Sequence, residues 1–300
     1  MLNRVATSTQ TTQMMEHLQS SSSSLSEIEG QVASGKRIQQ VSDDPTSAIS
    51  ALAQRAELTQ TTQYTRNAND ATDWLNTTDS ALSSVVTALQ SARTSLVQAQ
   101  SGGLDSASRA AIASQLQASV QTLLSTANTT RLGRPIFAGT AGVTQAFDSS
   151  GNYLGDSGAV GRTVATGVNI GVNQTGDAVF GTYNASDPTT GNVFQLLGSL
   201  ANAVSTGDTA SITSGLSKLD SATARVENAQ VAVGSTTNQV SGLLDQATTA
   251  TSTLQSGINS LEDVDIAKAS ITLATRQMAY QAALSAAAKI SQPTLLDFLR

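Results

Sequence analysis

Cysteine is absent from this chain of 300 residues, and aromatic residues make up only 3% of it. The absence of cysteine excludes disulfides, thiolate nucleophiles and cysteine-ligated zinc. Charged residues account for 13% of the sequence, about half their share in an ordinary soluble domain. Because large side chains are scarce, each helix can bury little apolar surface, and burial of apolar surface is the main force that folds a chain. The composition therefore predicts a thinly packed, mostly helical protein and argues against a compact globule with one core.

Basic charge and long apolar runs are also missing. The net charge is −6 and the isoelectric point is near 4.7, whereas phosphate binding requires clustered Lys and Arg, so no nucleic-acid partner is expected. No apolar run reaches the about 18 residues that a spanning helix needs, so membrane insertion is not expected. The chain passes from Met1–Arg4 directly into Ser, Thr and Gln, which predicts that it has no cleavable secretory signal peptide.

The strongest pattern in the sequence is a repeat of seven residues. Apolar or small residues recur with 4,3 spacing over residues 68–99 and again over residues 212–261. A shorter series covers residues 113–127. A seam that repeats every 3.5 residues faces a partner helix. The sequence therefore predicts a mainly α fold in which long antiparallel heptad helices form a coiled-coil rod.

The composition changes in the middle of the chain. Between Gly133 and Gly198 lie 13 of the 22 glycines and 6 of the 10 aromatic residues. Short alternating runs at residues 163–165 and 168–172, bounded by turn residues, are typical of strands. We expect a small β-rich insert over residues 135–193, with a helical body formed by residues 41–134 and 194–264.

Local signals mark where the first helix ends and the second begins. Gly35 is a suitable residue to stop a helix. Asp44 precedes a proline, which pushes it out of the α region. It can therefore cap a helix that starts at Pro45.

The two ends of the chain carry matching heptad seams, and we expect residues 1–40 and 265–300 to form paired terminal helices. Each helix alone buries too little to be firmly held. We therefore predict that both termini are mobile in the free molecule and fold on assembly. The seam residues expected to form the assembly interface are Leu18, Leu25, Ile28, Val32, Leu273, Tyr280 and Leu284.

Residues that could carry out catalysis are few and isolated. His17 is the only histidine, and the sequence marks neither a nucleophile nor an orienting partner for it. The segment Asp148–Asn152 weakly resembles a calcium loop, but it lacks the spacing and the closing glutamate of an EF-hand, so a β-turn is favoured. The acidic pairs at residues 43–44 and 263–265 flank helix starts, where capping explains them. No catalytic residue, cofactor site or metal site is expected, and the chain is not expected to be an enzyme.

Three motifs resemble the flagellin superfamily, and within it the junction proteins associated with the flagellar hook. The first is Ser34-Gly35-Lys36-Arg37-Ile38 followed by an "SDDP" sequence. The second, "RPIFAGT" at residues 134–140, resembles the family's "YIFAGT" element, and the third, residues 286–299, is similar to its "KISQLSLLDYL" ending. The motif residues are Ser42, Asp43, Asp44, Pro45, Phe137, Ala138, Gly139 and Thr140.

The resemblance implies a structural protein of the bacterial flagellum, located outside the cell. Such proteins leave through the flagellar type III export channel after a cytoplasmic chaperone has bound the C-terminal helix. They form a ring of copies that contacts the first hook-associated protein on one side and flagellin on the other. In the family, the paired terminal helices form the innermost layer, and the β insert faces outward.

Alternatives to the junction ring make different predictions. A flagellin, which builds the filament itself, would share the helical ends but not the "IFAGT" motif or the "LLDFL" ending. A secreted enzyme with coiled-coil arms would need a catalytic constellation, and an unrelated coiled-coil scaffold would have ordered termini in the free molecule. Pro293 departs from the family ending, and we expect the last helix to kink or end near Gln292.

Overall fold

The structure is a computed structural model that describes residues 2–101 and 103–291. The chain divides into two compact units. The terminal unit consists of residues 1–59 and 251–300, and the central unit consists of residues 60–250. Each unit is described by itself below.

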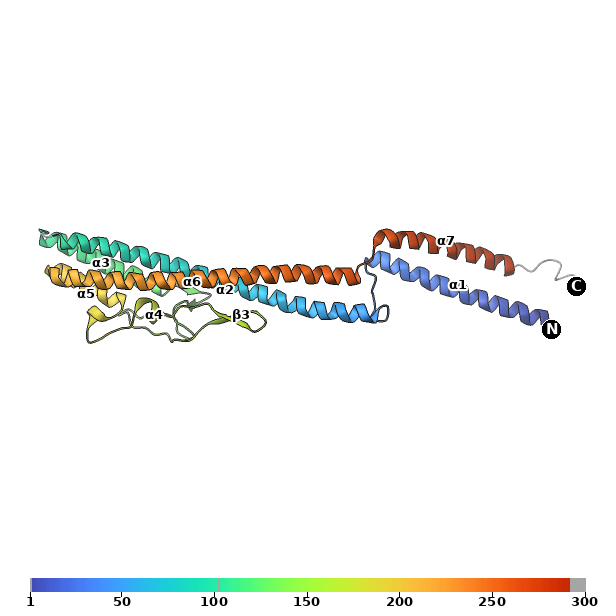
Figure 1. The fold of residues 1–300 in the computed structure, drawn as a ribbon, viewed down its shortest axis with the longest axis horizontal. Helices are drawn as coiled ribbons and strands as arrows, with labels where there is room; N and C mark the ends of the chain where they lie inside the picture. Colours follow the sequence, from blue (N-terminus) through green and yellow to red (C-terminus); the bar gives the residue numbers. More distant parts are fainter. Residues whose placement is uncertain (1, 102, 292–300) are drawn as a thin grey trace. The chain divides into compact units, whose positions relative to one another are not determined.

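Long helices dominate the chain, which confirms the mainly α fold class (Figure 1). The helices are α1 (Leu2–Ser34), α2 (Pro45–Gln100), α3 (Ser106–Ala127), α4 (Gly176–Phe180), α5 (Val193–Thr206), α6 (Thr209–Glu262) and α7 (Ile266–Ser291), with a short 3-10 helix η1 (Pro188–Thr190). The strands are β1 (Thr130–Arg131), β2 (Arg134–Pro135), β3 (Gly161–Ala165) and β4 (Val168–Gly171). They form two antiparallel sheets of two strands each, β1-β2 and β3-β4.

The predicted heptad seam of α2 forms the core of the central unit. Every member of the series over residues 68–99 is buried, with exposed fractions between 0% and 8%. Arg93 Nε lies 2.7 Å from Asp220 Oδ1, and Gln100 Nε2 lies 2.8 Å from Thr213 Oγ1. Residue numbers on α6 thus fall as those on α2 rise, so the two helices are antiparallel. Both the heptad prediction and the antiparallel direction are confirmed.

The central unit also contains α3 and α5, which pack against each other. The apolar face of α5 is almost continuous, and its buried residues include Phe194, Leu197 and Val204. Asn192 caps the N-terminus of α5 by accepting from the Gln195 amide, and Gly207 ends the helix in the left-handed conformation, at φ +75°. The helix is therefore bounded by a matched pair of local signals.

The insert confirms the two predicted strands, which form the β3-β4 hairpin, but most of it is irregular loop. A cluster of aromatic rings gives the insert its core. The ring of Phe147 is fully buried and lies 5.1 to 5.3 Å, between centroids, from the rings of Tyr153, Phe180 and Phe194. Burial raises the pKa of the Tyr153 hydroxyl to about 12, and this hydroxyl donates to a backbone carbonyl at 2.9 Å. The rings supply the apolar contact that short strands cannot provide.

The terminal unit contains α1 and α7, which lie side by side (Figure 1). The pairing of the two terminal helices is thus present within a single chain. The pair is thin, however, because none of the described side chains of α1 is fully buried, and on α7 only Ala269 is. Packing on this scale stabilises helices far less than the seam of α2 does.

Candidate assembly surfaces and the connector clasp

The predicted interface residues of α1 all lie on one half-buried face. Leu18, Leu25, Ile28 and Val32 are each intermediate in exposure, as their 3- and 4-residue spacing requires. This face of α1 is the apolar part of the contact with α7.

The predicted interface residues of α7 do not share one face. Leu273 and Tyr280 are half-buried, whereas Leu284 is 52% exposed. Ile266 is exposed as well, so Ile266 and Leu284 lie off the face of α7 that packs against α1. The reason is that the inner face is formed largely by alanines, which carry little apolar signal in the sequence. Along α7 the inner face therefore passes through Ala269, Leu273, Tyr280, Ala283 and Ala287.

The segments that connect α1 to α2 and α6 to α7 are joined by backbone hydrogen bonds. Lys36 and Asp263 form an antiparallel bridge. The Arg37 amide donates to the Glu262 carbonyl at 2.6 Å, and the Val264 amide donates to the carbonyl of residue 35 at 3.0 Å. We call this arrangement, together with its side chains, the connector clasp. It fixes the ends of four helices at one point in the terminal unit.

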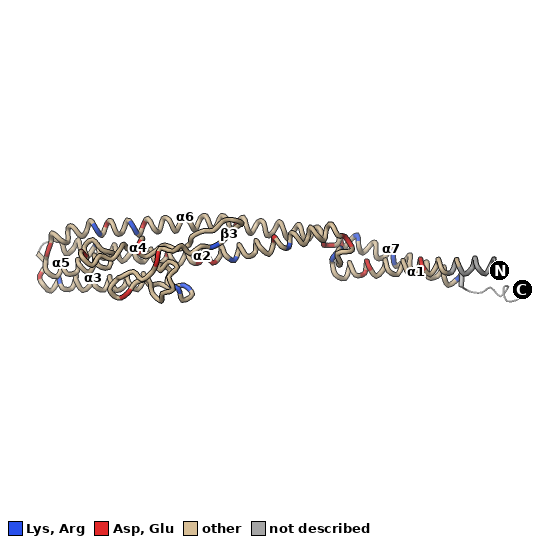
Figure 2. The backbone as a smooth tube through the Cα atoms, turned by 90° about the horizontal axis from the view of Figure 1, so that it is seen from below, with Lys and Arg blue, Asp and Glu red and all other residues tan. Residues whose placement is uncertain are grey.

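Charged residues lie in and beside the connector clasp, and Figure 2 marks their positions along the backbone in blue and red where α1 and α7 meet the connectors. The carboxylate of Glu262 is nearly buried and accepts from Arg55 Nη2 at 2.6 Å, with Lys36 Nζ at 3.6 Å. Lys36 Nζ also lies 2.6 Å from Asp263 Oδ1, and this hydrogen bond raises the pKa of the Lys36 ammonium. A buried carboxylate with two cationic neighbours is stable only while both neighbours stay in place. Neither Arg55 nor Glu262 could be identified from the sequence, because their contact joins residues 207 positions apart.

Of the two acidic motif residues, Asp44 caps the start of α2, as predicted, and Asp43 holds the connector before it. Asp44 Oδ1 accepts from the Ser47 amide at 3.1 Å, and its Oδ2 lies 3.1 Å from Arg37 Nη1. These contacts with Ser47 and Arg37 lower the pKa of the Asp44 carboxyl to about 2. Asp43 Oδ2 accepts from the amides of residues 40 and 39, which lowers the pKa of its carboxyl as well. Gly35 adopts φ +70°, so it ends α1 in the conformation that glycine tolerates best.

These low pKa values predict how the start of α2 responds to acid. The folded pKa of Asp44, about 2, lies below its ordinary value of 3.8. The stabilisation is therefore fully present above about pH 4 and is lost as the pH falls through about 2. We expect the amide of Ser47 to exchange faster with solvent over this interval, measured by hydrogen exchange. The variant Asp44→Asn keeps a capping side chain that does not titrate, so its Ser47 amide should lack this pH response. An equal response in both proteins would show that the Asp44 carboxylate is not the cap.

The second motif joins separate segments of the insert. Phe137 is fully buried, and its carbonyl accepts from the Gly176 amide at 2.9 Å. Gly139 adopts φ +68°, and a Cβ at this position would collide with Asp156. Thr140 donates twice to the Asp156 carboxylate, from its amide at 2.7 Å and from its hydroxyl at 2.8 Å. The motif therefore has a structural role, in which glycine permits a close approach of two loops.

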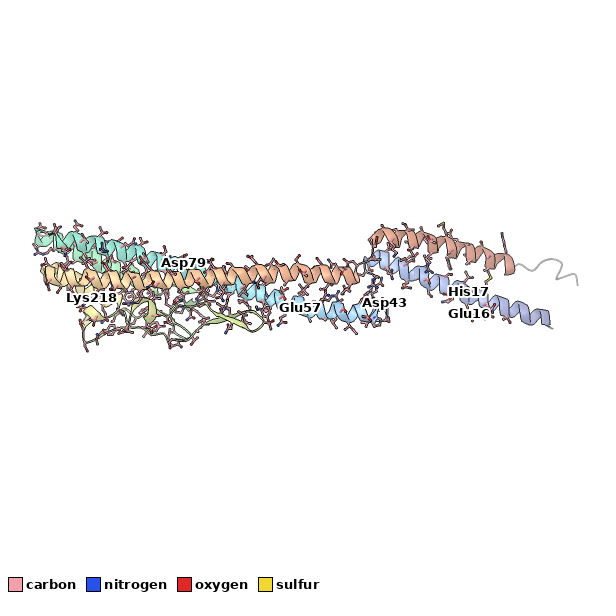
Figure 3. All side chains as sticks on the ribbon, viewed as in Figure 1. Glu16, His17, Asp43, Glu57, Asp79 and Lys218 are labelled. Carbon is pink, nitrogen blue, oxygen red and sulfur yellow. The ribbon has the colours of Figure 1, made fainter. Side chains whose placement is uncertain are left out.

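Other polar groups in the described part of the chain show no catalytic arrangement. Figure 3 shows His17 beside Glu16 on α1, and both side chains are exposed. Asp148 accepts from the amides of Ser150 and Asn152, both at 2.8 Å, in a turn, which confirms the β-turn interpretation. Among the described residues there is no group of three or more His, Asp or Glu close enough to hold a metal ion. None of the described helices is long and apolar enough to cross a membrane.

A groove of about 540 Å³ lies between α5 and α6. Its charged residues already have partners: Lys218 Nζ donates to Thr189 Oγ1 at 2.8 Å, and Asp208 accepts from Ser211 at the start of α6. The groove therefore presents no convergent set of free polar groups of the kind that ligand sites contain.

Family models match both ends of the chain. The bacterial flagellin N-terminal helical region matches residues 5–141, and the bacterial flagellin C-terminal helical region matches residues 216–299. The Flagellar hook-associated protein 3 of Escherichia coli (strain K12) is 30% identical over 244 residues, covering 78% of this chain and 74% of that protein. The protein of the same name from Salmonella typhimurium is 29% identical over 185 residues, covering 61% of this chain and 58% of that protein.

Solved structures share the fold. A putative flagellar hook-associated protein from Vibrio parahaemolyticus aligns with a TM-score of 0.67 at 23% identity, over 74% of this chain and 100% of that one. FlgL from Bacillus cereus aligns with a TM-score of 0.60 at 22% identity, over 69% and 99%. The flagellar junction protein FlgL from Legionella pneumophila aligns with a TM-score of 0.58 at 18% identity, over 71% and 100%.

Proposed function

This chain belongs to the flagellar hook-associated protein 3 family of the flagellin superfamily, and we propose that copies of it form the ring that joins the flagellar hook to the filament. It is a structural component of the bacterial flagellum, and its relatives are hook-associated proteins, not filament subunits. This counts against the alternative that the chain is a flagellin that builds the filament itself.

In this proposal the ring contacts the first hook-associated protein on one side and flagellin on the other. The chain is exported through the flagellar type III channel, after a cytoplasmic chaperone has held its C-terminal helix. It acts outside the cell as a mechanical adaptor and not as an enzyme.

The observation that carries the proposal is the contrast between the two units. The seam of α2 in the central unit is fully buried within one chain, whereas α1 and α7 bury almost nothing completely. Helices that leave so much of their surface in water gain stability from neighbouring molecules. We infer that α1 and α7, with the seven predicted interface residues, form the contacts between copies in the ring.

Deletion of the gene tests the proposed function. Electron microscopy of the deletion strain should show hooks without filaments, and flagellin should accumulate in the culture medium. A plasmid copy of the wild-type gene should restore the filaments. Filaments of normal length and number in the deletion strain would contradict the junction role, and purified protein that polymerises into long filaments without flagellin would favour the filament subunit.

A further inference from the structure

Helix α7 has an apolar face that nothing covers in the described part of the chain. Ile271 is 71% exposed and Met278 is 63% exposed. Ala274 and Ala282 are exposed between and beyond them. At 100° per residue these positions lie roughly opposite Ala269 and Tyr280, which face α1. We call Ile271, Ala274, Met278 and Ala282 the α7 stripe.

The first turns of α2 carry a second uncovered apolar face. Ile49 is 66% exposed and Leu52 is 67% exposed. With the exposed Ala53 and Ala56 they fill positions i, i+3, i+4 and i+7 of one helix face. We call these four residues the α2 patch. The connector residue just before α2, Val41, is also 66% exposed.

The unpaired charges beside the two faces are opposite, since Arg55, which adjoins the α2 patch, is already paired with Glu262. On α7, the charged residues from Ile266 to Ser291 are Lys268, Arg276 and Lys289, all basic. None of the three has an ion-pair partner among residues 2–101 and 103–291. Beside the α2 patch the exposed acidic residues are Asp43 and Glu57, both labelled in Figure 3.

Opposite charges make contact between the two faces favourable, whereas contact of the α7 stripe with another α7 stripe would bring basic residues together. A contact between different faces of identical chains is heterologous, and repeated heterologous contacts close into a ring when the rotation allows it. A contact of the stripe with itself would stop at a dimer.

We propose that the α7 stripe of one copy packs on the α2 patch of the next copy, so that this heterologous contact propagates around the ring. The proposal rests on the proposed function, because it identifies which surfaces of the terminal unit join neighbouring copies. The occupant of each face is thus a second copy of this chain, and the first hook-associated protein and flagellin are left to other surfaces.

The absence of cysteine makes a direct test possible. Cells that lack the native gene express Leu52→Cys and Met278→Cys as separate chains, with a short tag on one of them so that each kind of dimer has its own mass. Flagella are isolated and oxidised, and disulfide-linked dimers are separated on a non-reducing gel. A disulfide forms only where two Cα atoms come within about 4.4–6.8 Å. We expect mainly the mixed dimer of the two variants.

The matched control is Val231→Cys, at an equally exposed apolar residue of α6 in the central unit. This variant should form no dimer with Leu52→Cys.

Dimers of Met278→Cys with itself or of Leu52→Cys with itself as the main product would overturn the proposal, and so would the absence of mixed dimers in flagella with normal filaments. The absence of mixed dimers would leave the proposed junction role untouched, because the deletion strain tests that role separately. In a second measurement, Glu57→Lys should lower the yield of mixed dimer several-fold, and Lys268→Glu added on the other chain should restore it. If Lys268→Glu does not restore the yield of mixed dimer, opposite charges do not contribute to this contact.

Discussion

Replacement of Leu25 by Asp is expected to abolish filament attachment and swimming. Leu25 is half-buried on the face of α1 that packs against α7. A carboxylate at this position would lose water without gaining a partner, which costs several kcal/mol when the site is fully desolvated by neighbouring molecules. Swimming in soft agar and electron microscopy of the hooks measure the effect.

The matched control for this variant is Ser26→Asp, which adds the same charge at an exposed position of the same helix. Ser26→Asp should retain filaments. The fluorescence of Trp74, the only tryptophan and a buried residue of the central unit, should be the same in both variants and in the wild type. Normal filaments on Leu25→Asp hooks would show that this face of α1 is not used in assembly.

Replacement of Phe147 by Ala is expected to destabilise the insert strongly. The ring is fully buried among three other rings, and truncation of such a residue costs about 3–5 kcal/mol. For a unit of this size the thermal midpoint should fall by roughly 10 °C, measured by circular dichroism with Trp74 fluorescence as a second signal.

Leu132→Ala is the corresponding control, because this apolar residue is the most exposed of the large hydrophobic side chains in the described chain. It should shift the midpoint by less than about 2 °C. Equal midpoints for Phe147→Ala and wild type would mean that the aromatic cluster does not hold the insert together.

The helices of the central unit could be predicted from the sequence because their signal is local and periodic. Ten positions of α2 repeat without interruption, and all ten are buried. The start of α2 could also be predicted, because the capping residue Asp44 and Pro45 are neighbours in the chain. Helix α5 carried comparable signals in Asn192 and Gly207, but they lie among other glycines and asparagines and were not recognised.

The connector clasp could not be predicted in the same way. Lys36 and Asp263 are 227 positions apart, and each is an ordinary charged residue in its own segment. The inner face of α7 was predicted only in part, because alanines such as Ala269 and Ala283 carry little apolar signal even where they form the contact. Where small residues form the contact, the sequence pattern therefore does not show which face of the helix is buried.

Hydrogen exchange across the terminal helices tests the central claim most directly. The claim is that α1 and α7 acquire their stability from neighbouring copies, which follows from how little either helix buries completely. In dilute, free protein the amides of α1 and α7 should exchange within seconds to minutes while the core amides of α2 stay protected, and in isolated flagella the amides of both terminal helices should become protected. Terminal helices as protected as α2 in the free molecule would contradict the account.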